Sequence, residues 1–155
     1  YFAGHGTYKQ KGNELIGYWV PLNAKSIDVD YISSTKLAEL VAGSNVKHLL
    51  MLSDACYGGA MRSSNEIKPP GQLEYKLKSR QVLTSGGLEK VPGNSVFVPM
   101  VMKALQLNTN KYLSVAELYN IIYNGVKKQT DNEPRLNDFG KDGNEGGQFY
   151  FVLKN

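Results

Sequence analysis

Two residues of this chain could together cleave an amide bond. His5 lies between Gly4 and Gly6, and Cys56, the only cysteine, follows roughly 50 residues later. A thiol is a weak nucleophile until it loses its proton, and a nearby imidazole can take that proton and later deliver it to a leaving amine. The backbone N–H groups of Gly6 and Cys56 are the natural donors to an oxyanion. We therefore predict a dyad with His5 as general base and Cys56 as nucleophile.

Short apolar runs precede both residues and must position them. The stretch from Val46 to Leu52 is nearly continuous in apolar residues, which is typical of a strand buried on both faces of a parallel sheet. The carboxyl ends of parallel strands meet at one edge of the sheet, so two successive βα units would bring His5 and Cys56 together. Taken singly, each residue is more often a turn histidine or an inert buried thiol. Their equivalent positions favour the catalytic interpretation.

The rest of the chain alternates between predicted helices and predicted strands. Three helices are expected, beginning at Ser34 or Thr35, at Ser95 and at Ser114, and the first ends at Gly43. Further strands are expected at 81–84 and 148–153, with loops at 5–14 and 130–147. This order predicts an α/β fold with a largely parallel sheet flanked by helices.

The composition limits the classes of function. The chain has 155 residues, of which 41% are hydrophobic and 21% charged, the balance of one soluble globular domain. No apolar run approaches the length of a membrane span. A single cysteine excludes an internal disulfide and metal sites with paired cysteines. The net charge of +4 lies largely between Arg62 and Arg80, where few aromatic residues are interleaved, so we predict neither a nucleic-acid nor a membrane partner.

Two segments resemble the signature motifs of the caspase-like cysteine peptidases, in particular their bacterial and metacaspase-like branch. They are Tyr1–Gly6 (YFAGHG) and Ser53–Gly59 (SDACYGG), and the resemblance continues through Tyr18–Pro21, Arg80–Gly87 and Ser95–Phe97. It implies a three-layer caspase-hemoglobinase fold over residues 1–155, with a mostly parallel sheet. The first strands of the family's domain would precede Tyr1, so the resemblance also implies an N-terminally incomplete domain.

The same resemblance implies a substrate pocket. Asp54 stands where caspases carry Gln, and in metacaspase-like members an Asp at this position lines the S1 pocket and favours Arg or Lys at P1. The alternative is that this carboxylate only caps the turn that follows. Ala3 occupies a position where metacaspases often carry Ser, and Thr84, Ser85 and Gly86 would pair with the substrate backbone as an added strand.

The expected function is a cysteine endopeptidase that cuts protein or peptide substrates after basic residues. Glu89 could face a basic substrate side chain or be merely solvated. The polar linker at 63–79 matches the segment in which caspase-like zymogens are cut, and its basic residues suggest self-processing. The alternatives are a related protease with another specificity, such as cleavage after Asp, and an inactive caspase-like signalling module.

Cofactors, assembly and location are expected as follows. Many metacaspases are activated by calcium, but the acidic residues of 131–145 do not have EF-hand spacing, so we predict no metal site and no cofactor. A monomer is favoured, and the strand at 149–153 would lie near the sheet edge if it matches the family's last strand. A cytoplasmic location is favoured over secretion.

Overall fold

The computed structural model describes residues 1–27, 29–56, 75–87, 94–139 and 142–154. Their elements, in chain order, are β1 (Phe2–Lys11), β2 (Glu14–Val20), β3 (Ile32–Ser33), α1 (Ser34–Ala42), β4 (His48–Ala55), β5 (Ser79–Thr84), α2 (Phe97–Leu107), β6 (Tyr112–Ser114), α3 (Val115–Lys127), β7 (Arg135–Asp138) and β8 (Tyr150–Val152). No helix within these ranges is long and apolar enough to cross a membrane.

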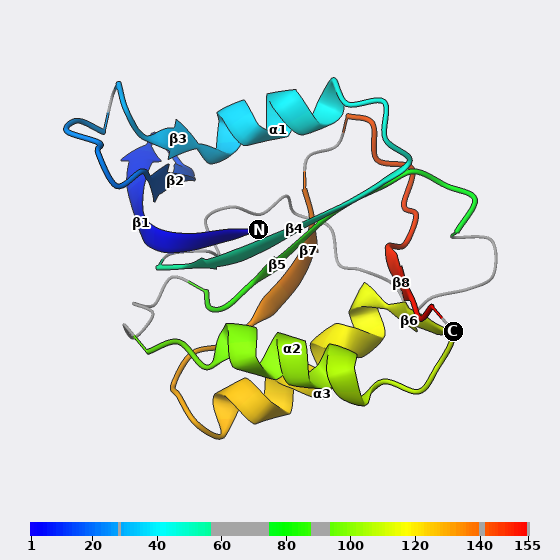
Figure 1. Cartoon of the computed structure of the whole chain (residues 1–155). Coiled ribbons are helices and arrows are strands. Elements are labelled where there is room, and N and C mark those ends of the chain that lie inside the picture. The colour runs from blue at the N-terminus through cyan, green and yellow to red at the C-terminus, as the bar shows by residue number, and fades with distance from the viewer. Residues whose placement is uncertain (28, 57–74, 88–93, 140–141, 155) are drawn as a thin grey trace.

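The elements form a mixed α/β fold in three layers. Six strands make one sheet in the order β3-β2-β1-β4-β5-β7, and β6 and β8 pair separately. The centre of the sheet, β1-β4-β5, is parallel, whereas β2, β3 and β7 pair antiparallel with their neighbours. Helix α1 lies on one face of the sheet, and α2 and α3 lie on the other (Figure 1). The predicted α/β class is confirmed, with parallel pairing confined to the centre.

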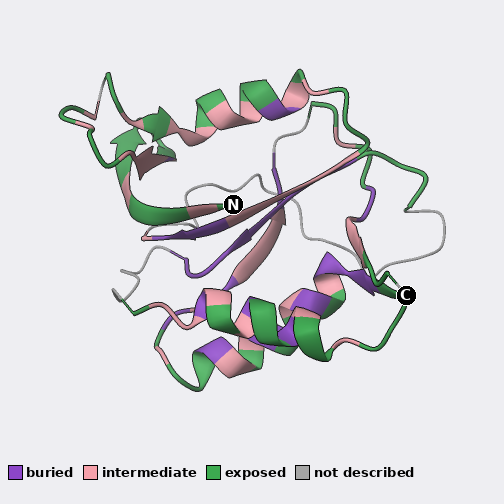
Figure 2. Cartoon of the chain, in the orientation of Figure 1, coloured by how far each residue is buried: buried purple, intermediate pink, exposed green. Residues whose placement is uncertain are grey.

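Each face of the sheet packs against its own apolar core. Along β4, Leu50 and Leu52 join the larger core beneath α2 and α3, whereas Leu49 and Met51 join the smaller core beneath α1. Figure 2 shows more purple on α2 and α3 than on α1, whose buried residue is Val41. This double packing explains why the sequence of β4 lacks polar alternation. It also allows each side chain near the strand end to be assigned to a face.

Local capping signals predict the helix starts closely. Helix α1 is capped by Ser33, one residue earlier than predicted. Helix α3 has the predicted capping box between Ser114 and Glu117. Helix α2 begins at Phe97 and its N-cap is Val96, which makes no side-chain capping hydrogen bond, so the predicted cap at Ser95 is one residue early. The hydroxyl of Ser95 accepts the backbone N–H of Phe97 at 3.2 Å.

The predicted loop at 5–14 is wrong, because these residues form a β-hairpin. Strands β1 and β2 pair antiparallel from His5 opposite Val20 to Lys11 opposite Glu14. Gly12 has φ of 63° and opens the turn, a conformation that glycine adopts without strain. The Gly-Asn pair was a recognisable hairpin signal, but the polar, mostly exposed outer half of β1 obscured it.

The C-terminal strands also differ from the prediction. The predicted loop at 130–147 contains β7, a four-residue strand that pairs with β5 and is too short for a clear sequence pattern. The predicted last strand exists as β8, but it pairs with β6 and not with the main sheet. The expectation that 149–153 lies near the main-sheet edge is therefore wrong, because Tyr112–Ser114 takes up its backbone hydrogen bonds.

Candidate active site

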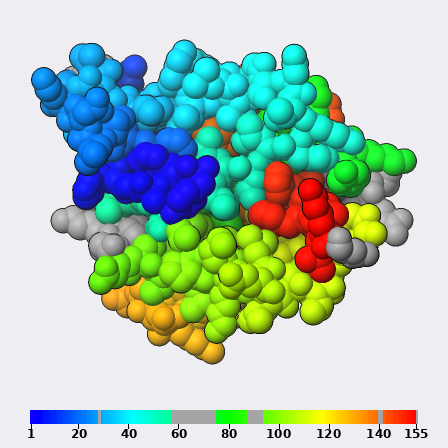
Figure 3. Space-filling model, in the orientation of Figure 1, coloured from blue at the N-terminus to red at the C-terminus, as the bar shows by residue number. Residues whose placement is uncertain are grey.

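The predicted dyad lies where the parallel pairing of β1 with β4 ends. Cys56 directly follows β4, as predicted, but His5 lies inside β1, which continues to Lys11 as one arm of the hairpin with β2, so the predicted strand end before His5 is wrong. β1 pairs with β4 with Gly4 opposite Ala55. His5 follows Gly4 and Cys56 follows Ala55, so the backbones of the two dyad residues lie next to each other. His5 is exposed and Cys56 is half-buried. In Figure 3 the dark-blue N-terminal residues lie on the surface between the cyan segment of α1 and the green segment of α2.

Gly6 lies directly against the backbone of Cys56. A Cβ atom at position 6 would fall 2.1 Å from the carbonyl oxygen of Cys56 and 3.3 Å from the Cβ of Ala55. The first distance is far inside van der Waals contact, so only glycine permits this approach. The two predicted oxyanion donors, Gly6 and Cys56, thus belong to backbone segments in contact.

Strand alternation assigns the side chains around the dyad to opposite faces of the sheet. On the α1 side, the hydroxyl of Ser53 accepts from Nε1 of Trp19 at 3.0 Å, and Phe2 stacks on the same indole with ring centroids 4.3 Å apart. Asp54 is the next residue of β4, so it faces the α2 side. Ala3 is opposite Asp54 in the register and faces the same way. The predicted pocket residues of the first two motifs therefore share one face.

The carboxylate of Asp54 is enclosed but hydrogen-bonded. Asp54 is 7% exposed, and the hydroxyl of Ser95 donates to its Oδ1 at 2.9 Å. Burial, and then the negative charge of Asp54, raise the pKa of the Tyr1 phenol above its ordinary value. The sequence predicts Ser95 as a helix cap and as part of the resemblance at Ser95–Phe97, but no local pattern signals its contact with a strand residue 41 positions away.

Thr84 is the last residue of β5, Ser85 and Gly86 follow it directly, and all three are buried. Thr84 pairs with Ser53 of β4 on one side and with Arg135 of β7 on the other. The hydroxyl of Thr84 donates to the carbonyl of Gly86 at 2.9 Å, and the N–H of Ser85 donates to the carbonyl of Ser53 at 3.0 Å. A substrate strand added here would compete with β4 and β7 for these backbone groups.

The C-terminal end of the predicted linker is hydrogen-bonded to the sheet at the start of β4 and β5, away from the dyad. Nε2 of His48 donates to the carbonyl of Tyr75 at 3.0 Å, and Nδ1 is 3.0 Å from the hydroxyl of Ser79. The backbone N–H of Lys78 donates to Glu145 at 2.8 Å. The remainder of the predicted linker, 63–74, and Glu89 lie outside the described residues.

The acidic residues of 131–145 serve separate contacts. Glu133 bonds to Lys127, and Glu145 accepts from Lys78. Asp138 lies in β7, where burial raises its pKa and a hydrogen bond from Asn144 partly opposes that rise. Over the described ranges, no three His, Cys, Asp or Glu side chains gather as a metal site would require.

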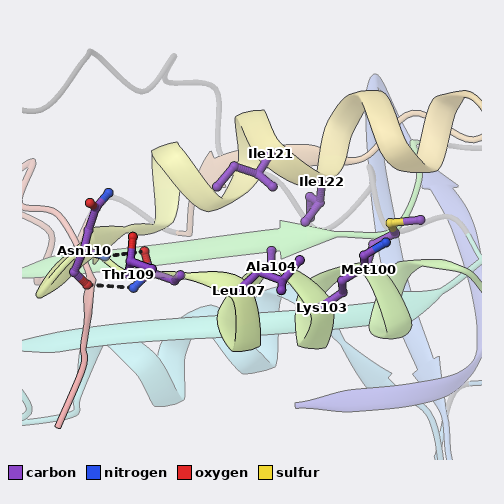
Figure 4. Close-up of a pocket in the computed structure, with 9 residues that line it drawn as sticks. Met100, Lys103, Ala104, Leu107, Thr109, Asn110, Ile121 and Ile122 are labelled. Carbon is purple, nitrogen blue, oxygen red and sulfur yellow. Dashed lines mark hydrogen bonds between the residues drawn. The ribbon is translucent and has the colours of Figure 1, made fainter. Parts of the chain in front are cut away.

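A surface cavity of about 380 Å³ lies between α2 and α3, toward the C-terminal end of α2 (Figure 4). Its lining is mainly apolar and comes from Met100, Ala104, Leu107, Ile121 and Ile122. Among its described lining residues, Lys103 is the only charged one. The cavity is separate from the predicted dyad, since Asp54 is near the other end of α2 through its contact with Ser95.

The fold and the site together define an α/β protein that carries a histidine and a cysteine where the parallel pairing of two adjacent strands ends. Comparisons with models of protein families, with curated proteins and with solved structures found no match to this chain. The function is therefore argued from the residues and their geometry.

Proposed function

We propose that this chain is a caspase-like cysteine endopeptidase that cuts after Arg or Lys. The observation that supports this most directly is the register between β1 and β4, in which Gly4 is opposite Ala55 and the dyad residues are the next residues after this last parallel pair. The parallel centre β1-β4-β5, the antiparallel β7 beside it and the helices on both faces are consistent with the caspase-like fold that the sequence resembles.

The proposed mechanism uses the dyad in both halves of the reaction. His5 takes the proton of the Cys56 thiol, and the thiolate attacks the carbonyl carbon of the scissile peptide bond. The N–H groups of Gly6 and Cys56 stabilise the negative oxygen that develops. His5 then gives its proton to the leaving amine, which leaves a thioester on Cys56. His5 next removes a proton from a water molecule, which hydrolyses the thioester and frees the thiol.

Asp54 accounts for the proposed specificity. A nearly buried carboxylate binds a guanidinium or ammonium group through charge-assisted hydrogen bonds. An acidic P1 side chain would instead meet a like charge. The pocket proposal therefore favours Arg and Lys over Asp at P1.

The test is a panel of fluorogenic peptides with Arg, Lys or Asp at P1, assayed with and without calcium. Wild type is expected to cleave the Arg and Lys peptides, and Cys56→Ala and His5→Ala are expected to cleave none. Equal turnover by Cys56→Ala and wild type would overturn the mechanism. Cleavage of the Asp peptides alone would overturn the pocket assignment. No turnover in any arm would favour the inactive caspase-like module.

A further inference from the structure

We propose that Ser95 is a positioning residue of the substrate pocket, which holds the Asp54 carboxylate in the orientation that receives a P1 guanidinium group. This inference rests on the proposed function. It assigns a specificity role to a residue that lies outside both signature motifs. Its basis is the contact between the hydroxyl of Ser95 and Oδ1 of Asp54, at 2.9 Å.

The direction of this hydrogen bond is set by its neighbours. An ionised carboxylate only accepts, so the hydroxyl of Ser95 must donate its proton to Asp54. The hydroxyl oxygen of Ser95 also accepts the backbone N–H of Phe97 at 3.2 Å. The hydroxyl is therefore held from both sides, with its proton directed at Oδ1.

Ser95 is in turn anchored by the core. Phe97 is 1% exposed and belongs to the larger apolar cluster, against which Val96 also packs. The hydroxyl is therefore presented to the carboxylate by a segment that packs on the core, and its hydrogen bond restrains the last torsion angle of Asp54, which is broad in a free aspartate.

One carboxylate oxygen stays available. Among the residues that the structure describes, Ser95 supplies the side-chain hydrogen bond to Asp54, and Oδ2 accepts none. A guanidinium forms its best pair with a carboxylate whose plane is fixed, because its N–H groups have a rigid planar geometry. Ser95 therefore favours Arg at P1 by orienting Asp54 before the substrate arrives.

The experiment measures binding without turnover. In the Cys56→Ala chain, calorimetry compares a peptide with Arg at P1 and the same peptide with citrulline, the neutral isostere. The dissociation constant of the citrulline peptide divided by that of the Arg peptide measures the preference for Arg. This ratio is expected to fall by about tenfold in Ser95→Ala and Ser95→Gly, because a hydrogen bond to a charged group is lost. Ser95→Thr, which keeps the hydroxyl, is expected to retain the ratio.

A purely structural role for Ser95 would weaken both peptides equally and leave this ratio unchanged, which would overturn the proposal. Asp54→Asn is expected to abolish the Arg preference and to make Ser95→Ala silent when the two are combined. If the chain binds Arg peptides selectively but the form with Cys56 cleaves none, the peptidase proposal fails and the role of Ser95 stands. If the Cys56→Ala chain shows no Arg preference, the role of Ser95 is overturned whether or not wild type cleaves peptides.

Discussion

Gly6 is the residue of the candidate site with the least steric freedom. We expect Gly6→Ala to lower kcat/KM for an Arg peptide by about 100-fold or more, because a Cβ 2.1 Å from the Cys56 carbonyl oxygen forces the backbones at Gly6 and Cys56 apart. The melting temperature should fall as well. Peptide kinetics and thermal unfolding of the same preparation measure both effects.

Gly43→Ala is the matched control for this substitution. A Cβ at Gly43 would be 3.6 Å from the carbonyl of Glu39, which is ordinary contact, and φ at this position is −73°. Activity and melting temperature should therefore stay close to those of wild type. A fully active and stable Gly6→Ala variant would contradict the close approach at the site.

Asp54 carries the proposed selectivity at the residue scale. Asp54→Asn keeps the shape and removes the charge, so kcat/KM for Arg and Lys peptides should fall about 10- to 100-fold. The control is Ser53→Ala, since Ser53 faces the other side of the sheet and bonds to Trp19. Ser53→Ala should lower stability without changing the ratio of Arg to neutral peptides. An equal ratio in wild type and Asp54→Asn would remove this residue from the pocket.

At the scale of elements, one arginine connects the end of α1 to β5. Arg80 is fully buried. Its five side-chain N–H groups donate to five backbone carbonyls, which belong to Val41, Ser44, Val46, Lys47 and Ser79. The contact with Val41 also places a positive charge at a helix C-terminus, where the helix dipole favours it. Arg80 therefore supplies hydrogen-bond donors to several backbone carbonyls at once.

We expect Arg80→Met to lower the free energy of unfolding by roughly 3 kcal/mol or more, because several carbonyls lose their donors. Urea denaturation provides the measurement. Lys78→Met is the control: Lys78 is exposed and uses only its backbone in hydrogen bonds, so its effect should stay within about 0.5 kcal/mol. Equal effects of the two substitutions would contradict the role of the arginine.

His48 makes the attachment of Tyr75 to the sheet dependent on pH. Burial lowers the pKa of His48 below 6.5, the charges of Lys47 and Arg80 lower it further, and the hydrogen bond to the Tyr75 carbonyl partly opposes them. Between this lowered pKa and the unfolded value of about 6.5, the unfolded chain binds more protons than the folded one. The contribution of His48 to the free energy of unfolding is therefore fully present above this pH range and is lost as the pH falls through it.

Urea midpoints at pH 7.5 and pH 5.5 test this expectation. Wild type should lose more stability between the two than His48→Gln, which has no titrating group at this position. Identical losses in the two proteins would show that His48 does not contribute to the pH dependence.

At the scale of the whole molecule, the linker joins β4 and β5, two adjacent parallel strands of the sheet. β4 and β5 pair in register from His48 opposite Ser79 to Ser53 opposite Thr84. A cut between these strands would leave both fragments joined by that ladder. If the chain processes itself, we expect the fragments to co-elute in native size-exclusion chromatography and to separate in denaturant.

The position of such a cut is also restricted. A protease binds its substrate in an extended form, but Arg80 is buried in β5, and the backbone of Lys78 is bonded to Glu145 and Gly147. We expect cleavage after Arg62, Lys68 or Lys76. Intact-mass analysis of wild type and Cys56→Ala would reveal it, and a fragment that ends at Arg80 would contradict the expectation.

Much of the site could be predicted because its signals are local. The apolar run before Cys56 predicts a strand buried on both faces, and the structure has β4 there. The Ser114 and Glu117 capping box is likewise legible, because its two hydrogen bonds span three residues. The sequence by itself therefore determined the class of fold and the strand end that carries the cysteine.

Contacts between residues far apart in the sequence could be identified only from the tertiary structure. The hydrogen bond from Ser95 to Asp54, the approach of Gly6 to Cys56 and the pairing of β7 with β5 all join residues far apart in the chain. None leaves a periodic pattern, because each depends on which strand or helix end lies beside it. The pairing of β8 with β6 was decided in the same way, by competition between edges for backbone hydrogen bonds. The sequence thus determined which residues could do chemistry, and only the packing of the strands decided which of them lie together.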